Sequence, residues 1–236
     1  MKKSTNNSKG NQSFASFLRR LKLDQSGLAV TEFAFSLPIF LGIGMFGSES
    51  AFLFAANTAV SQAALTLADN ASRLGQNGTG TGTPTITDAD VKQALDGLRL
   101  QTNKIGLLEN GRVILSSLEV GNNSAGVPRQ FIRWQRCLGL RMDVSDYGGP
   151  STPNTAPASF QGLGPSTARV QAVANTAVMF VEIEYRYQPL FGEAFLAETI
   201  LRQEAAFNIR DDRNLGAGLV NNIGTAATTC NKFTVS

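Results

Sequence analysis

The longest apolar stretch of the sequence lies near its N-terminus, at residues 28–46. It reads LAVTEFAFSLPIFLGIGMF, and its apolar character resumes at 51–54 after a short break of small and polar residues. About 20 residues at about 1.5 Å each cross a hydrocarbon core about 30 Å thick. The pattern therefore predicts one transmembrane helix over residues 28–54.

Beyond residue 54 the apolar positions recur every three or four residues, which is typical of a helix with one buried face. These positions are Ala56, Ala59, Val60, Ala63, Ala64, Leu67, Ala71 and Leu74. We expect the helix to continue as a stalk over residues 55–75. Its apolar face either packs entirely on its own domain or is divided between that domain and a neighbouring subunit.

The segment 76–236 has the pattern of a small mixed domain. After a Gly-rich linker, Thr87 with the acids Asp88 and Asp90 predicts the start of a helix that runs to about Leu98. Four strand-like runs follow, at 112–120, 130–137, 177–187 and 205–210. The first two predict a β-hairpin. We expect an α+β fold in which the long N-terminal helix packs on a small antiparallel sheet of about four strands.

The run 177–187 alternates most clearly between two faces. One face holds Val181, Ile183, Tyr185 and Tyr187, and the other holds Phe180, Glu182, Glu184 and Arg186. We interpret the charged face as a solvated side of the sheet, and the alternative is a stripe that docks a partner. Residues 148–165 are rich in Gly, Pro, Ser and Thr, and we expect a long loop there.

Charge is distributed unevenly along the chain. Up to Gly27 there are six basic residues and one acid, which leaves 15 of the 21 basic and 17 of the 18 acidic residues for the rest. A basic flank before a transmembrane helix remains in the cytoplasm. We therefore expect a cytoplasmic leader at 1–27, a single-pass anchor in the inner (cytoplasmic) membrane, and a periplasmic C-terminal domain, with no nucleic-acid partner.

Glu32 does not fit an ordinary membrane segment. A secretory signal peptide has a shorter apolar region that ends in small residues, and Glu32 sits where that region should be most apolar. A plain uncleaved anchor does not explain this acid either. A carboxylate at the centre of a bilayer costs about 2.5–3.5 kcal/mol, and less near the edge, so it marks a functional position with a partner.

Spacing suggests what that partner is. If the chain is cut after Gly27, Leu28 becomes the first residue and Glu32 the fifth, about one helical turn from the new α-amino group. In an assembling bundle, Glu32 of one subunit can neutralise the terminal amine of a neighbour. Gly27 suits a membrane peptidase because an extended backbone without a side chain fits a narrow site.

The residues around this position resemble a known signal. Residues 19–27, followed by Leu28, and the pattern GxAxxEFAFxLP at 27–38 look like a class III prepilin signal and, more closely, like TadE-like pseudopilins of the Flp/Tad pilus system. Segments 134–139 and 181–191 are similar to C-terminal signatures of the same proteins. The major Flp pilin is very short and has Glu-Tyr, whereas here Glu32 precedes Phe33 and the domain is large.

The resemblance therefore implies a minor bacterial pilin or pseudopilin with a pilin-like helix, and not the bulk subunit of the filament. It implies cleavage between Gly27 and Leu28 by a prepilin peptidase, and roles for Glu32 and Phe33 in assembly. The implied partners are the prepilin peptidase, other pilins or pseudopilins and the inner membrane. If the protein enters a pilus, its destination is the cell surface.

Cys137 and Cys230 are the two cysteines of the chain. Both lie in the part that we place on the oxidising side of the membrane, where a disulfide between them can form and persist. Such a bond would tie the C-terminal tail to the sheet. The alternative is a pair of buried free thiols.

The composition argues against catalysis. The chain has no His, the commonest general base and a common metal ligand. Asp143-Val144-Ser145-Asp146 faintly resembles a metal-dependent adhesion motif, but Tyr147 stands where a second Ser belongs, and Asp211-Asp212 fits a charged turn better than a calcium site. We expect no catalytic residue, metal, cofactor or small-molecule substrate.

Three functions remain for comparison. The first is a minor pilin that is cleaved and then enters, or primes, a Flp/Tad-type pilus. The second is an uncleaved bitopic envelope protein whose periplasmic domain binds a ligand or has an adhesive role. The third is an adhesin at a pilus tip. The first predicts loss of residues 1–27, and the second predicts that they are retained.

Overall fold

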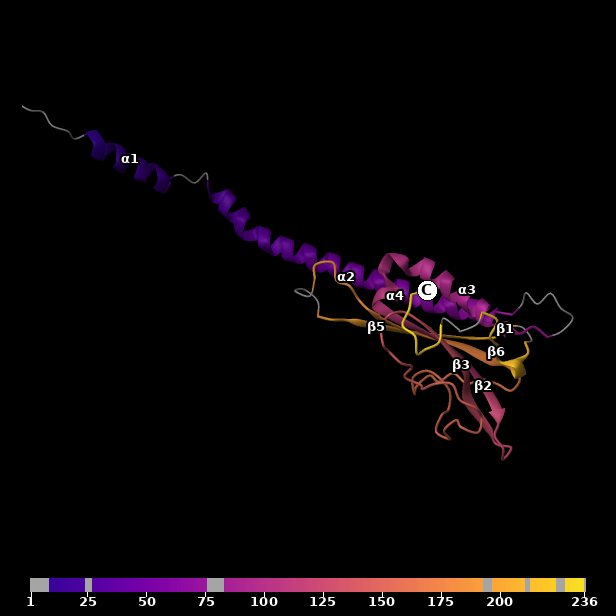
Figure 1. The fold of residues 1–236 in the computed structure, drawn as a ribbon. Helices are drawn as coiled ribbons and strands as arrows, with labels where there is room; N and C mark the ends of the chain where they lie inside the picture. The colour runs from indigo at the N-terminus through magenta and orange to yellow at the C-terminus, as the bar shows by residue number, and fades with distance from the viewer. Residues whose placement is uncertain are drawn as a thin grey trace, which may run out of the picture. The chain divides into compact units, whose positions relative to one another are not determined.

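The computed structural model describes residues 9–23, 27–75, 83–192, 197–210, 213–223 and 228–235 (Figure 1). The chain divides into two compact units, residues 1–48 and 49–236. The first unit contains helix α1 (Lys9–Leu23) and the start of helix α2 (Leu28–Ser72). The second unit, called the lobe below, contains the remainder of α2 and the sheet.

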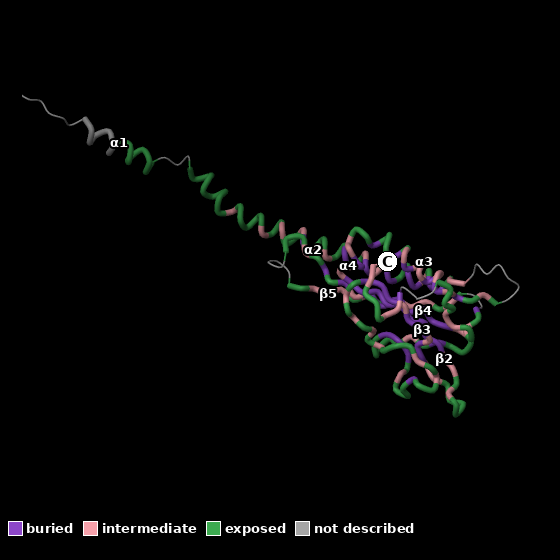
Figure 2. Tube along the Cα trace, in the orientation of Figure 1, coloured by how far each residue is buried: buried purple, intermediate pink, exposed green. Residues whose placement is uncertain are grey.

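Helix α2 is continuous over 45 residues and includes Pro38. It joins the predicted transmembrane helix and the predicted stalk, and it ends at Ser72 in a turn that reaches Gly75. Its first part is exposed, whereas the part within the lobe is increasingly buried (Figure 2). Among the described residues, it is the one helix long and apolar enough to cross a membrane. Residues 49–54, which the apolar pattern assigned to the membrane, belong by their contacts to the lobe.

The sheet of the lobe has four antiparallel strands in the order β3-β2-β4-β5. Their bounds are β2 (Gly111–Asn122), β3 (Pro128–Leu138), β4 (Ala177–Arg186) and β5 (Ile200–Asn208). The α+β fold with a long helix and a small antiparallel sheet is confirmed, as are the hairpin and the strand at 177–187. The last strand begins five residues earlier than the expected Ala205, because Ile200 to Gln203 pair with β4.

Short elements complete the lobe. Helix α3 (Asp88–Thr102) begins where the sequence predicts, with Thr87 and Asp90 forming a reciprocal capping box. The 3-10 helix η1 (Asn103–Ile105) and helix α4 (Leu107–Asn110) then lead into β2. Strand β1 (Ile86–Thr87) pairs in parallel with β6 (Leu219–Val220), which follows the 3-10 helix η2 (Leu215–Ala217). The β1–β6 pair is not apparent from local sequence patterns.

The main core lies between α2 and one face of the sheet. Val60 and Leu67 of α2 pack in one buried cluster with Val181 and Ile183 of β4, and each of these side chains is at most 1% exposed. Full burial of such a side chain contributes about 1.5–3 kcal/mol. The small residues of the stalk, mostly alanines, leave room for a close approach of helix and sheet. The three-and-four periodicity of the stalk therefore marks a face that its own sheet covers.

The opposite face of the sheet is not simply solvated, and our interpretation of it was wrong in part. The long connection 139–176 folds back over this face, and its Leu163 joins Phe180 of β4 in a second buried cluster. Glu182 is only 7% exposed, Glu184 is half-buried, and Arg186 alone of the three is exposed. Alternation along β4 predicts which face each residue occupies, but it does not show that a loop covers the second face.

The C-terminal tail is fastened to β3. A disulfide joins Cys137 to Cys230, the pair expected from the sequence, and Gly139 and Thr234 form a β-bridge. Arg112, which is 1% exposed, lies beneath the tail and donates hydrogen bonds to three carbonyl oxygens, those of Gly139, Cys230 and Lys232. The buried guanidinium therefore links β2, the end of β3 and the tail.

Replacement of Arg112 by Met should loosen the tail. The three carbonyls would lose a charged donor, so we expect the free energy of unfolding of the detergent-solubilised protein to fall by about 2–4 kcal/mol. The Gly139 amide, which donates to Thr234, should exchange its hydrogen faster. Arg99→Met is the control, because Arg99 is exposed on α3 and its nitrogen is 3.9 Å from Asp96. Equal stability of the two variants would contradict the role of Arg112.

Candidate functional site

The predicted processing position lies at the start of helix α2. Gly27 is outside both helices, and its carbonyl accepts the first helical hydrogen bond, from the Thr31 amide at 3.0 Å. Gly27 therefore occupies the N-cap position and Leu28 is the first helical residue. Leu28 is 59% exposed, so the Gly27–Leu28 peptide bond lies at an exposed helix end.

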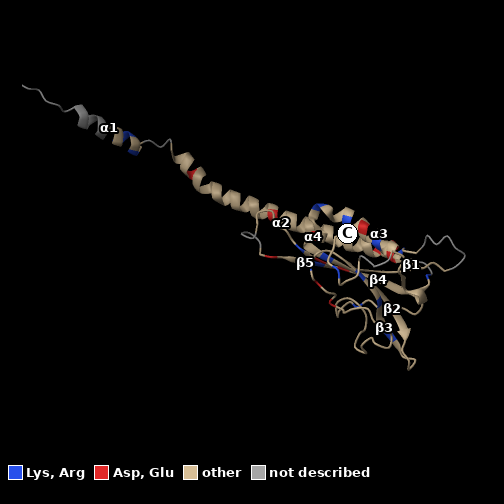
Figure 3. Cartoon of the chain, viewed as in Figure 1, with Lys and Arg blue, Asp and Glu red and all other residues tan. Residues whose placement is uncertain are grey.

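Glu32 and Phe33 follow in the first turns of the same helix, and both are exposed. Glu32 lies about 6 Å along the helix axis from Leu28, at about 1.5 Å per residue. In the cartoon of Figure 3, charged residues are sparse along this part of α2 and more frequent in the lobe. The structure thus brings Gly27, Leu28, Glu32 and Phe33 together at one helix end, whereas Cys137 and Cys230 belong to the lobe.

A second acid of α2, Glu49, has partners that sequence analysis missed. It is 2% exposed, and its carboxylate accepts hydrogen bonds from the Tyr187 hydroxyl at 2.8 Å and from the amides of Leu190 and Phe191 at 3.2 and 3.1 Å. Three donors make a buried carboxylate tolerable. Glu49 therefore fastens the loop after β4 to α2. The only local signal is an acid at the end of an apolar run, because its partners lie 138–142 residues away.

Residues of the segment 134–139, which resembles a TadE-like signature, make structural contacts within the lobe. Trp134 is buried in the main core, and Arg136 pairs with the buried Asp88 at 2.7 Å. Gly139 has a φ of +115°, and a Cβ atom there would collide with the Gly111 carbonyl. Only glycine fits such a close approach of two strands. The burial of Trp134 makes this aromatic side chain part of the packing of the main core.

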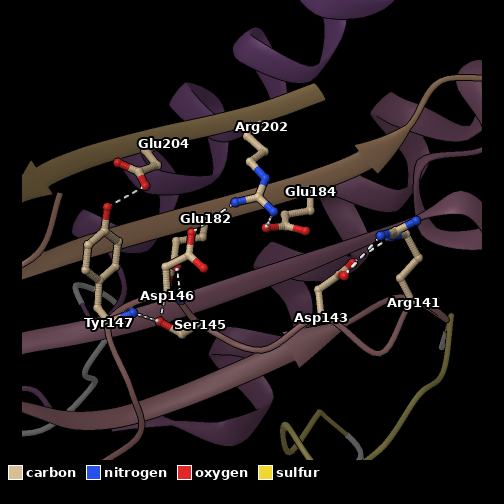
Figure 4. A network of polar contacts seen from close by, with 9 residues as sticks. All are labelled: Arg141, Asp143, Ser145, Asp146, Tyr147, Glu182, Glu184, Arg202 and Glu204. Carbon is tan, nitrogen blue, oxygen red and sulfur yellow. Dashed lines mark hydrogen bonds and ion pairs between the residues drawn. The ribbon is translucent and has the colours of Figure 1, made fainter. Parts of the chain in front are cut away.

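The outer face of the sheet holds a network of acids, tyrosine and arginine (Figure 4). Glu182 of β4 accepts hydrogen bonds from the Ser145 hydroxyl at 2.7 Å and the Asp146 amide at 3.2 Å. The Tyr147 hydroxyl donates to Glu204 of β5 at 2.7 Å. These contacts fasten residues 145–147 across two strands, so the loop is held to the sheet by hydrogen bonds as well as by its apolar contacts.

Arginines balance part of the acidic charge in this network. Arg202 of β5 pairs with Asp146 at 3.3 Å and with Glu184 at 3.1 Å, and Arg141 pairs with Asp143 at 2.6 Å. The residues of the faint adhesion motif thus bind other protein groups. In the described part of the chain, no group of three or more His, Cys, Asp or Glu side chains could hold a metal ion. Asp211 and Asp212 lie outside the described residues.

Burial changes the proton affinity of this network. Desolvation raises the pKa of Glu182 to about 7, although the hydrogen bonds from Ser145 and Asp146 oppose the rise. Desolvation, reinforced by the Glu204 carboxylate, also raises the pKa of Tyr147. On the helix-facing side of the sheet, desolvation raises the pKa of Glu119 to about 6 against the attraction of Arg133. Glu182 therefore titrates near neutral pH as a consequence of the loop that covers it.

Stability should depend on pH through Glu182. Its pKa in the folded state, about 7, exceeds the ordinary 4.5, so the folded protein holds the proton more tightly than the unfolded chain. The resulting stability is complete below about pH 4.5 and is lost as the pH rises to about 7. Relative to Glu182→Gln, the wild-type free energy of unfolding should fall by on the order of 2–3 kcal/mol over this range.

Chemical denaturation of the detergent-solubilised protein at a series of pH values measures this difference. Glu109→Gln, at an exposed position of α4, is the matched control and should follow the wild type. Glu119 is present in all three proteins, so its titration cancels in the comparison. Parallel curves for the wild type and Glu182→Gln would show that the covering loop does not shift the pKa of Glu182.

Comparisons with known proteins add no family to this description. No protein-family model matches the chain, and no curated protein or solved structure matches it either. The structure by itself establishes an α+β lobe and one N-terminal apolar helix long enough to span a membrane. Any function assigned to the chain must therefore be argued from its own residues.

Proposed function

We propose that this protein is a minor pilin or pseudopilin, similar to TadE-like proteins, of a Flp/Tad-type pilus in a bacterium. A prepilin peptidase cuts between Gly27 and Leu28, and the mature chain then enters the pilus or primes its assembly in the inner membrane. Before assembly the chain crosses that membrane once, with residues 1–27 in the cytoplasm and the lobe in the periplasm.

The observation that carries the proposal is the arrangement of α2. Its N-terminal end combines a glycine N-cap, an exposed apolar surface and an exposed acid one turn into the helix. Its C-terminal half forms part of the core of the lobe. A subunit of this kind can be held by lipid at one end and carry a folded domain at the other, which is what stepwise extraction from a membrane into a filament requires.

Cleavage gives Glu32 its partner. The cut creates an ammonium group on Leu28, and the Glu32 carboxylate of a neighbouring subunit can neutralise it. Each charge alone is costly in lipid, while the pair is much less so, since their attraction is strong where water is excluded. The pair therefore favours association of subunits after processing. The exposed Phe33 beside Glu32 supplies apolar contact area at the same subunit contact.

Processing is tested by the intact mass and N-terminal sequence of protein extracted from membranes. We expect the mature chain to begin at Leu28 in cells with a prepilin peptidase, and to retain residues 1–27 in cells without one. Gly27→Val, which adds a branched side chain before the scissile bond, should block the cut. Retention of residues 1–27 in peptidase-positive cells that build pili would reject the proposal and favour an uncleaved bitopic envelope protein.

Assembly is tested by Glu32→Ala. Cleavage should persist because the Gly27–Leu28 bond is unchanged, whereas the protein recovered with sheared pili, or the number of pili if the protein acts as a primer, should fall by roughly tenfold or more. A tenfold change corresponds to about 1.4 kcal/mol. In the variant, the ammonium group of Leu28 is left in lipid without its partner. Ser36→Ala, a change in the same apolar segment, is the control. Normal piliation of Glu32→Ala would exclude the charge pair.

A further inference from the structure

The position of Glu49 along α2 places part of the lobe at a membrane surface. Residues 28–48 number about 20 and extend about 30 Å, which is the thickness of a hydrocarbon core. The polar headgroup layer adds about 5–7 Å on each side. The helix residues from Glu49 to about Phe52 therefore fall in the headgroup layer on the periplasmic side of the inner membrane. This step rests on the membrane span of the proposed function.

Glu49 also determines which other part of the chain reaches that layer. Its three hydrogen bonds hold Tyr187, Leu190 and Phe191 directly against α2. Leu190 nevertheless leaves 54% of its surface exposed, and Phe191 leaves 36%. Phe52 of α2 is 54% exposed as well. Large apolar side chains held at the level of the headgroups can bury this surface in lipid without any change of fold.

Leu190 and Phe52 line one groove of about 370 Å³. Apolar and aromatic side chains form most of its walls, among them Ala55 of α2 and Ile105 of η1. Lys104 is the one charged residue of the lining, and no acid is part of it. An apolar groove with a single cation matches an anionic phospholipid, whose phosphate can pair with the ammonium while acyl carbons occupy the apolar part.

We propose that the Glu49-anchored loop 187–191 and the adjacent groove form a lipid-binding surface that seats the lobe on the outer leaflet of the membrane. Leu190, Phe191 and Phe52 enter the interfacial layer, and Lys104 binds the phosphate of an anionic phospholipid. The Glu49 carboxylate is a positioning group, because it holds the loop in place through Tyr187 and two backbone amides.

Spin labels on the full-length chain in bilayers of phosphatidylcholine and phosphatidylglycerol test this surface. The native cysteines are joined in the disulfide, so an introduced cysteine is the one free thiol. Leu190→Cys reports the loop, and Phe40→Cys reports the apolar part of α2. Met142→Cys, at a 79% exposed position of the outer-face loop, is the control. Accessibility to oxygen and to a water-soluble nickel chelate gives the depth of each label.

We expect the labels at positions 40 and 190 to be more accessible to oxygen than to the nickel chelate, with the label at 190 nearer the membrane surface. The label at 142 should be more accessible to the chelate than to oxygen. If the label at 190 is as accessible to the chelate as the label at 142, while the label at 40 remains in lipid, the proposed lipid-binding surface is wrong. The membrane span is not affected by that result. Protection of 190 from both reagents also overturns it and indicates a protein contact. A water-exposed label at 40 rejects the span itself.

A second measurement tests whether Lys104 binds the phosphate of an anionic phospholipid. Native mass spectrometry of the full-length protein should show preferential retention of phosphatidylglycerol over phosphatidylcholine, and Lys104→Gln should reduce this preference by about fivefold. The control is Lys92→Gln, because Lys92 is paired with Asp96 at 3.0 Å on α3 and does not line the groove. An unchanged preference in Lys104→Gln would overturn the assignment of this residue to the headgroup.

Discussion

Helix α2 combines two kinds of surface on one backbone, an exposed apolar one and one that packs in a protein core. An α-helix can pass from lipid into a protein core because all its backbone hydrogen bonds are made within the helix. Only the side chains change, from mostly apolar before residue 49 to apolar on one face beyond it. The lobe, the exposed apolar segment and the predicted processing position are all arranged along this helix. Helix α2 is continuous through Ser48 and Glu49.

Two acids on α2 illustrate two solutions to the same electrostatic problem. Glu49 is buried, and its own chain supplies three hydrogen-bond donors. Glu32 is exposed on a helix surface where water would be absent in a membrane. The first acid is explained by the folded monomer. The second makes physical sense in lipid when a positive group from another molecule approaches it, and we propose that cleavage after Gly27 creates that group.

Polar groups fasten two long segments of the chain to the sheet of the lobe. Arg112 and the disulfide fasten the tail to the outer face of the sheet, and Glu182 and Tyr147 fasten the long loop to the same face. The first arrangement joins an arginine to neutral carbonyls, and its charge does not depend on pH near neutrality. The second includes a carboxylate that burial brings close to neutral titration. The loop contact is therefore the more sensitive of the two to pH.

Local pattern in the sequence determined the long helix, the capping box at Thr87, the hairpin and the two faces of β4, because each depends on residues a few positions apart. The same pattern singled out Gly27 and Glu32, whose relation is also local. Tertiary structure alone decided that Glu49 binds a loop about 140 residues away, that Arg112 lies under the tail, and that Glu182 is covered. Periodicity shows which side of an element a residue occupies. Contacts between distant segments depend on how the whole chain packs, so periodicity cannot show what covers that side.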